Sequence, residues 1–235
     1  MRHRASSDKA VSAAPATRTH RHTTGTPVSL RAGTSAAASR PVTFSPRCTP
    51  STGLRGRNAV MPSTPGQTGV IVPVAAADPL LSKVHHRFPQ LREEPVPAHV
   101  TVLYPFLPVT SVTPADLDAL RDLFAGFAPF PVRFSQARRF PRLLYLEPEP
   151  AEPFTEMTRR AVQRWPHLLP YGGKYGDSEP HLSVADFAPS DEPVLGAVEA
   201  ELAAQLPVSM VLDEAWLVVF DGSGWNRTHR FGFGS

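Results

Sequence analysis

The sequence predicts an α+β fold made of two similar halves. Short apolar strands alternate with helical patterns from about residue 66 to the end of the chain. Both halves show the order strand, helix, histidine-containing strand, helix, strand, strand, at similar intervals. Because duplicated α+β halves usually pack face to face, we expect the two histidine-containing strands to meet.

Two helices are expected in the first half, over 78–88 and 113–127. Asp78 is the predicted N-cap of the first helix and is followed by a proline, which suits the first turn. Thr113 is the predicted N-cap of the second, with Asp116 in its first turn. The strands expected in this half are 68–74, 99–106, 131–140 and 142–150.

The second half repeats these signals. In its last helix, Leu195, Val198, Leu202 and Leu206 recur at helical spacing. The expected helices are 152–165 and 191–206, and the expected strands are 181–187, 207–212, 214–220 and 229–234.

The positive charge of the chain is concentrated near its N-terminus. The whole sequence has a net charge of +3 and a pI near 9.3. Residues 1–65 hold ten Arg or Lys and one acidic residue, whereas residues 66–235 hold fourteen basic and twenty acidic residues. A broad basic surface for nucleic acid is therefore not expected on the acidic part.

Residues 1–65 have few large apolar side chains, so we predict a disordered basic tail ahead of one domain at 66–235. Three explanations remain open for the tail. It is a basic arm for RNA or lipid, an organellar transit peptide, or sequence upstream of a true start at Met61.

The amino-acid composition argues against a membrane span, an internal disulfide and a metal site. No stretch approaches the roughly 20 apolar residues of a membrane span. The single cysteine, Cys48, excludes an internal disulfide and fits a reducing compartment. We therefore predict a cytoplasmic, monomeric protein with no obligate protein partner. The histidines are scattered, so we expect no metal site and no cofactor.

The segments HVTV (99–102) and HLSV (181–184) stand out. In a strand, alternate side chains point to opposite faces. His99 and Thr101 therefore share one face of their strand, and His181 and Ser183 share one face of theirs. A single His-x-Ser/Thr is common by chance, and each histidine alone could be an ordinary half-buried strand residue. The informative signal is its repetition in equivalent strands.

Two imidazoles and two hydroxyls on one site suit the chemistry of phosphate esters. A neutral histidine can take a proton from water while a protonated one gives a proton to the leaving alkoxide. The usual histidine pKa near 6.5 makes both forms available close to neutral pH. The hydroxyls can donate to the non-bridging phosphate oxygens.

With these two motifs the chain resembles the two-histidine (2H) phosphoesterase superfamily, in the branch of RNA 2′,3′-cyclic phosphodiesterases also called 2′-5′ RNA ligases. The resemblance covers about 68–235. It implies a bilobal fold, with two small antiparallel sheets facing a central cleft and helices outside. It also implies His181 as the base, His99 as the acid, and Thr101 and Ser183 as phosphate ligands, without a metal.

The substrate implied is a 2′,3′-cyclic phosphate on a nucleotide or a short RNA end, which connects the chain to RNA processing. The acidic domain favours such a small substrate over a long RNA. Two alternatives remain: a non-catalytic module that binds a nucleotide or RNA end in the same cleft, and a structural protein. Possible substrate contacts are Arg138, Phe140, Tyr145, Tyr171, Lys174 and Tyr175.

Overall fold

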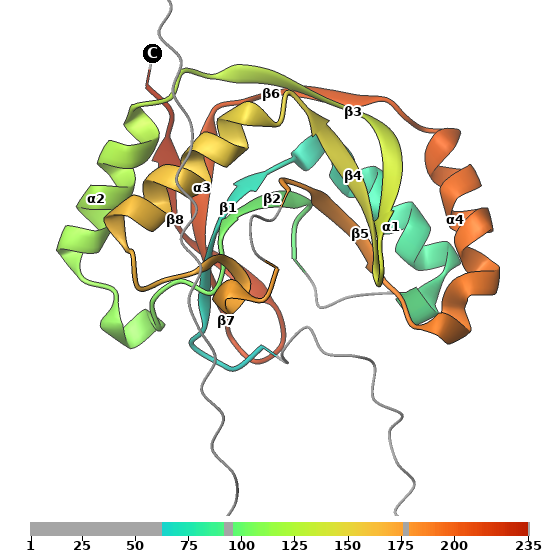
Figure 1. Cartoon of the computed structure of the whole chain (residues 1–235), viewed down its shortest axis with the longest axis horizontal. Helices are drawn as coiled ribbons and strands as arrows, with labels where there is room; N and C mark the ends of the chain where they lie inside the picture. Colours follow the sequence, from blue (N-terminus) through green and yellow to red (C-terminus); the bar gives the residue numbers. More distant parts are fainter. Residues whose placement is uncertain (1–62, 92–95, 176–178, 235) are drawn as a thin grey trace, which may run out of the picture. The chain divides into compact units, whose positions relative to one another are not determined.

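The computed structural model describes residues 63–91, 96–175 and 179–234, which alternate between strands and helices (Figure 1). The strands are β1 (Thr68–Pro73), β2 (His99–Leu103), β3 (Phe130–Phe140), β4 (Leu143–Glu149), β5 (Leu182–Asp186), β6 (Val208–Leu212), β7 (Glu214–Phe220) and β8 (Trp225–Gly232). The α-helices are α1 (Asp78–Arg87), α2 (Pro114–Ala125), α3 (Glu152–Arg164) and α4 (Glu192–Ala203). The predicted α+β class is confirmed.

All eight strands join one antiparallel sheet in the order β6-β3-β4-β5-β2-β1-β7-β8. Two separate sheets were expected from the resemblance. Instead, two four-stranded groups are connected at the centre, where β2 and β5 pair through Val100 and Leu182. The strands that carry the two motifs are therefore immediate neighbours.

The predicted repeat is present along the chain, because helix, motif strand, helix, strand, strand occurs twice. In space the two halves are interleaved. β3, in the first half, pairs with β4 of the same half and with β6 of the second half. β7, in the second half, pairs with β1 of the first half. Each four-stranded group thus contains strands from both halves.

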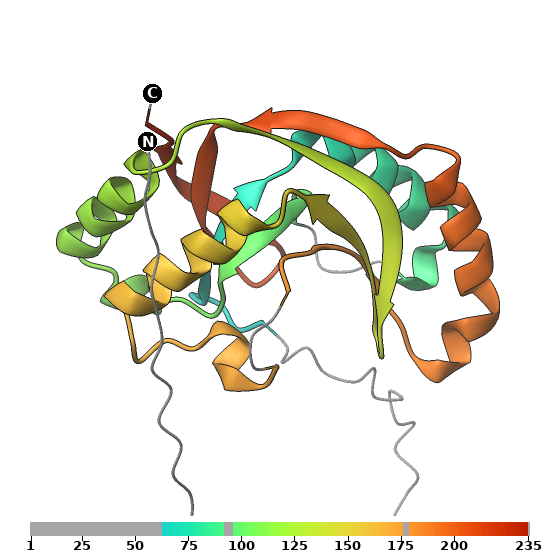
Figure 2. The ribbon, with the colours of Figure 1, turned by 45° about the horizontal axis from the view of Figure 1, so that its top comes forward.

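The helices form two pairs that lie at the left and right of the view, α2 with α3 and α1 with α4, and α3 packs on the central strand β2 (Figures 1 and 2). Apolar residues from all four helices and from the sheet form one core. Val100, Val102, Leu182 and Val184, the apolar positions of the motifs, are each at most 1% exposed. One face of each motif strand is therefore buried in the core.

Of the two predicted N-cap residues, one is confirmed and one is wrong. Thr113 caps α2 in a reciprocal capping box with Asp116, as expected. Asp78 does not cap α1, because it lies inside the first turn and its carboxylate binds the backbone N–H of Ala98 instead. Asp78 thus binds a backbone N–H twenty residues away and not one in the first turn of its own helix.

Most of the predicted tail, residues 1–62, lies outside the described residues. Within the described part of the chain, no helix is long and apolar enough to cross a membrane.

Candidate active site

The two motifs meet on one face of the sheet. β2 and β5 are antiparallel, with Val100 opposite Leu182. Continuing that register by one residue in each direction places Thr101 opposite His181 and His99 opposite Ser183. Directly opposed residues project from the same face of a sheet. All four polar side chains therefore lie on the face opposite the core, and each imidazole has the hydroxyl of the other motif as its neighbour.

Both histidines are held in the same way. The Nδ1 of His99 lies 2.7 Å from the carbonyl oxygen of Pro97, and the Nδ1 of His181 lies 2.8 Å from that of Glu179. A carbonyl oxygen only accepts hydrogen bonds, so each Nδ1 carries the hydrogen. In the neutral ring, Nε2 is then the nitrogen with a free lone pair. Both histidines thus offer Nε2 for proton transfer.

Burial lowers the pKa of both imidazoles. For His99, burial is the largest cause, and the positive charge that His181 carries when protonated lowers its pKa further. The carbonyl of Pro97 and the carboxylate of Asp78 act in the opposite direction. For His181, burial outweighs the raising effect of Glu179. A protonated His181 therefore disfavours protonation of His99.

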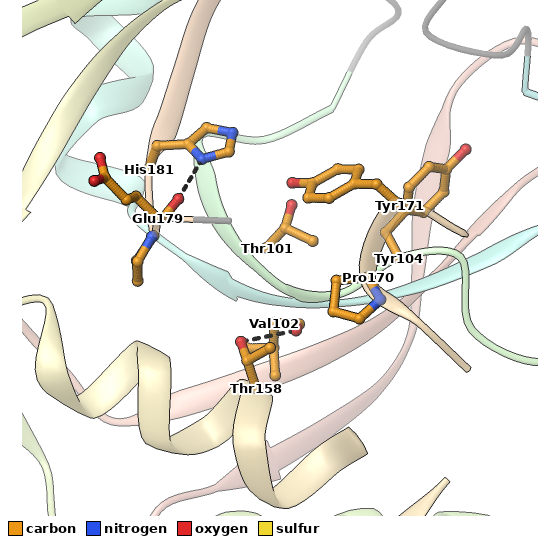
Figure 3. A pocket seen from close by; sticks show the side chains of 9 residues that line it. Thr101, Val102, Tyr104, Thr158, Pro170, Tyr171, Glu179 and His181 are labelled. Carbon is orange, nitrogen blue, oxygen red and sulfur yellow. Dashed lines mark hydrogen bonds between the residues drawn. The ribbon is translucent and has the colours of Figure 1, made fainter. Parts of the chain in front are cut away.

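A shallow hollow opens beside His181 (Figure 3). The Tyr171 hydroxyl points toward the Thr101 side chain at its edge. Burial raises the pKa of Tyr171, and a hydrogen bond with Thr101 acts in the opposite direction. The residues that line the hollow are Thr101, Val102, Tyr104, Thr158, Pro170, Tyr171, Glu179, Pro180 and His181.

Three aromatic rings surround His181. The ring centroids of Phe140 and Tyr145 lie 5.4 and 5.6 Å from that of the imidazole, both edge-on, and Tyr171 lies 6.4 Å away. Phe140 and Tyr145 stack on each other at 4.2 Å. They come from β3 and β4, so the hairpin next to β5 supplies an apolar wall for the site.

Tyr175, Arg138 and Lys174 are the other predicted substrate contacts. Tyr175 is 62% exposed and its ring contacts Tyr171 at 5.7 Å. Arg138 lies opposite Tyr145 in the β3–β4 register, but its guanidinium pairs with Glu147. Lys174 is exposed and is not among the residues that line the hollow. The structure therefore brings Phe140, Tyr145 and Tyr171 to His181, and Arg138 lies on the same sheet face, opposite Tyr145.

Tyr104 and Asp78 were not identified from the sequence as residues of the site or its surroundings. Tyr104 lines the hollow, its carbonyl accepts from the backbone N–H of Tyr171, and the two rings lie 6.2 Å apart. Its position five residues after His99 on the motif segment was the available signal. Asp78 influences His99 electrostatically from α1, which nothing in the local sequence indicates.

The fold and the paired histidine-hydroxyl motifs on one sheet face define a phosphoesterase-type protein. A family model described as the 2′-5′ RNA ligase superfamily matches residues 73–224. The chain belongs to this superfamily of phosphoesterases and ligases.

Solved structures with a similar fold include TT0787 of Thermus thermophilus, at 20% identity and a TM-score of 0.50, with 71% of this chain and 97% of that chain covered. LigT of E. coli complexed with NADP+ gives 16% identity, a TM-score of 0.44 and coverage of 74% and 100%. LigT complexed with 3′-AMP gives 13%, 0.47, and 73% and 100%. No curated protein matches the chain.

Proposed function

We propose that this chain is a metal-independent phosphodiesterase that hydrolyses 2′,3′-cyclic phosphates, with His99 and His181 as its acid–base pair. The observation that carries the proposal is the matched geometry of the two rings. Each binds a carbonyl through Nδ1, and each leaves Nε2 for proton transfer on the same face of the sheet. A pair of imidazoles arranged in this way can take one proton and give another in a single displacement.

In the proposed reaction, the Nε2 of His181 takes a proton from water as the water oxygen attacks phosphorus. The bond between phosphorus and the 3′ oxygen breaks, and the Nε2–H of His99 protonates that oxygen. The products are a 2′-phosphate and a free 3′-hydroxyl, and the two histidines have exchanged protonation states. In the reverse direction the same groups exchange roles and re-form the cyclic phosphate. With a 5′-hydroxyl in the place of water, the forward displacement would join two RNA ends through a 2′-5′ phosphodiester.

The hydroxyls of Thr101 and Ser183 are proposed to donate to the non-bridging phosphate oxygens. Each lies opposite the histidine of the other strand, so a phosphate between the rings would have a donor from both β2 and β5. Donors aimed at oxygens that gain charge in the transition state contribute strongly to catalysis.

A nucleotide or a short RNA end is the proposed substrate. Phe140, Tyr145 and Tyr171 place ring surfaces 5.4, 5.6 and 6.4 Å from the His181 ring, where they would offer a stacking surface to a base next to the reacting phosphate. Tyr175 would extend this surface outward, and Arg138 and Lys174 would lie nearer its rim. We propose that the working domain is the predicted segment 66–235.

Turnover of 2′,3′-cyclic AMP by the full chain, with EDTA present, tests the proposal. We expect hydrolysis by the wild type and a loss of about 100-fold or more in His99→Ala and in His181→Ala, as for other acid–base groups. Turnover that stops in EDTA would contradict the metal-independent mechanism. Binding of the nucleotide without any turnover, equal in wild type and variants, would show that the cleft is a binding module instead.

A further inference from the structure

Helix α1 bonds to both motif strands. The Asp78 carboxylate accepts the backbone N–H of Ala98 at 2.7 Å. The His85 ring lies with Nε2 2.8 Å from the carbonyl oxygen of Val184, and it must donate because a carbonyl only accepts. Ala98 directly precedes His99, and Val184 directly follows Ser183. One helix therefore fixes the backbone beside a residue of each motif.

These two bonds lie where the sheet is weakest between the motifs. β2 and β5 pair only at Val100 and Leu182 among the described residues, whereas β2 pairs with β1, and β5 with β4, over several residues. Continuing the β2–β5 register places Ala98 opposite Val184. The residues that α1 holds are thus the ones that face each other just beyond the last pair of the ladder.

The spacing of the two side chains suits this task. Asp78 and His85 are seven residues apart, which is about two helical turns, so they project from the same side of α1. The two positions are about 10 Å apart along the helix axis, whereas opposed residues of paired strands are about 5 Å apart, so the two side chains converge on the strands. A hydrogen-bonded helix holds such a spacing better than a loop would.

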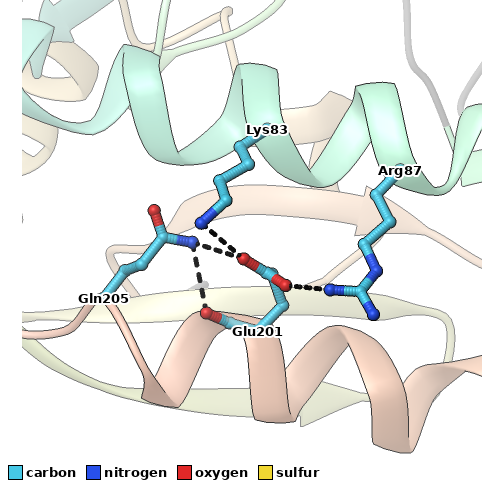
Figure 4. Close-up of polar contacts among 4 residues, drawn as sticks. All are labelled: Lys83, Arg87, Glu201 and Gln205. Carbon is cyan, nitrogen blue, oxygen red and sulfur yellow. Dashed lines mark hydrogen bonds and ion pairs between the residues drawn. The ribbon is translucent and has the colours of Figure 1, made fainter.

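A second side of α1 is tied to α4 (Figure 4). Glu201 of α4 pairs with Lys83 at 2.9 Å and with Arg87, and it also accepts from the Gln205 side chain. Its side chain is only 9% exposed. Hydrogen bonding to Lys83, above all, lowers the pKa of Glu201, so the carboxylate stays charged. These contacts hold α1 in place while its other side holds the strands.

We propose that α1 is a brace that sets the separation of the two motif strands, with Asp78 and His85 as positioning residues for His99 and Ser183. The inference rests on the proposed phosphodiesterase function, because the separation matters when both motifs grip one phosphate. A shift of about 1 Å in such a site can cost about 100-fold in rate.

His85 is tested by three variants of the full chain on 2′,3′-cyclic AMP. His85→Ala removes the donor, and we expect kcat to fall about 10- to 100-fold with a smaller change in KM. His85→Gln places an amide N–H near the position of Nε2, so it should recover most of the loss. His86→Ala is the matched control, because His86 is an exposed histidine on the same helix. Equal kcat in His85→Ala and His86→Ala, with both folded, would overturn the role of His85.

Asp78 is tested by Asp78→Asn, which keeps an oxygen for the Ala98 N–H but removes the charge. The charged groups that act on His99 are the Asp78 carboxylate and the His181 imidazole. The carboxylate raises the pKa of His99, so the variant should protonate His99 only at lower pH. NMR titration of the ring measures this without any substrate. An unchanged His99 titration would overturn the link from Asp78 to the site.

The two arms separate this proposal from the proposed function. A wild type that does not turn over cyclic nucleotides would end the phosphodiesterase proposal. The chemical shifts of His99 in Asp78→Ala, which removes the acceptor for the Ala98 N–H, and those of Ser183 in His85→Ala would still report whether α1 positions the two motifs. Unchanged Ser183 shifts in His85→Ala would overturn the brace even in an active enzyme.

Discussion

Val100 of β2 pairs with Leu182 of β5, and this register, continued by one residue in each direction, places Thr101 opposite His181 and His99 opposite Ser183. Each motif therefore contributes an imidazole to one side of the site and a hydroxyl to the other. A site assembled crosswise from two strands depends on both strands at once, because each histidine has the hydroxyl of the opposite motif as its neighbour.

The dependence of activity on pH follows from the lowered pKa values of both histidines. Catalysis needs one neutral and one protonated imidazole, so kcat/KM should follow a bell-shaped curve. A lowered pKa means that the protonated form is lost at lower pH than in an ordinary histidine. We expect the maximum below about pH 6.5 and a decline above it. A profile of kcat/KM from acid to alkaline pH checks this, and activity that keeps rising past neutral pH would contradict it.

Removing either hydroxyl should slow the chemical step. Thr101→Val and Ser183→Ala keep most of the volume and lose the donor, and each should lower kcat by about 100-fold, as for other donors to developing charge. Thr155→Val is a suitable control because Thr155 is exposed on α3. Steady-state kinetics on a cyclic nucleotide measure the effect. Normal kcat in both variants would show that the hydroxyls do not hold the phosphate.

Shortening Phe140 should weaken substrate binding more than chemistry. Its ring stacks on Tyr145 and packs edge-on against His181, so it offers a surface for a base without contacting the reacting atoms. Base stacking on an aromatic ring contributes about 1–3 kcal/mol, so Phe140→Ala should raise KM about 10-fold with little change in kcat. Val211→Ala, at an exposed apolar position on the edge strand β6, serves as the comparison. The hypothesis fails when both variants have the same KM.

Loss of the α2 cap should reduce stability without affecting the site. The Thr113 hydroxyl accepts a hydrogen bond from the backbone N–H of Asp116, and the Asp116 carboxylate accepts one from the backbone N–H of Thr113. Thr113→Ala should lower the free energy of unfolding by about 1 kcal/mol. Denaturant unfolding measures this, with Thr110→Ala, at a nearby exposed threonine, expected to stay within about 0.5 kcal/mol. An equal loss in the two variants would contradict a specific role of the cap.

Local signals in the sequence predicted local structure well. The alternation around His99 and His181 correctly indicated an apolar face, and Val100 and Leu182 are fully buried. The cap at Thr113 was identified because its partner is three residues away. Asp78 looked like a cap by the same reasoning, and that assignment was wrong because its partner, Ala98, is twenty residues away.

The sequence by itself determined which side chains are the candidates for the chemistry and which face of each motif strand they share, because strand periodicity is a property of neighbouring residues. Only the tertiary structure decided which strands pair. The pairing of β4 with β5 places Phe140 and Tyr145 beside His181, and the pairing of Val100 with Leu182 sets each hydroxyl opposite the other motif's histidine. Strand register depends on contacts between residues far apart in the chain, and the alternation of side chains within one strand does not specify its partner.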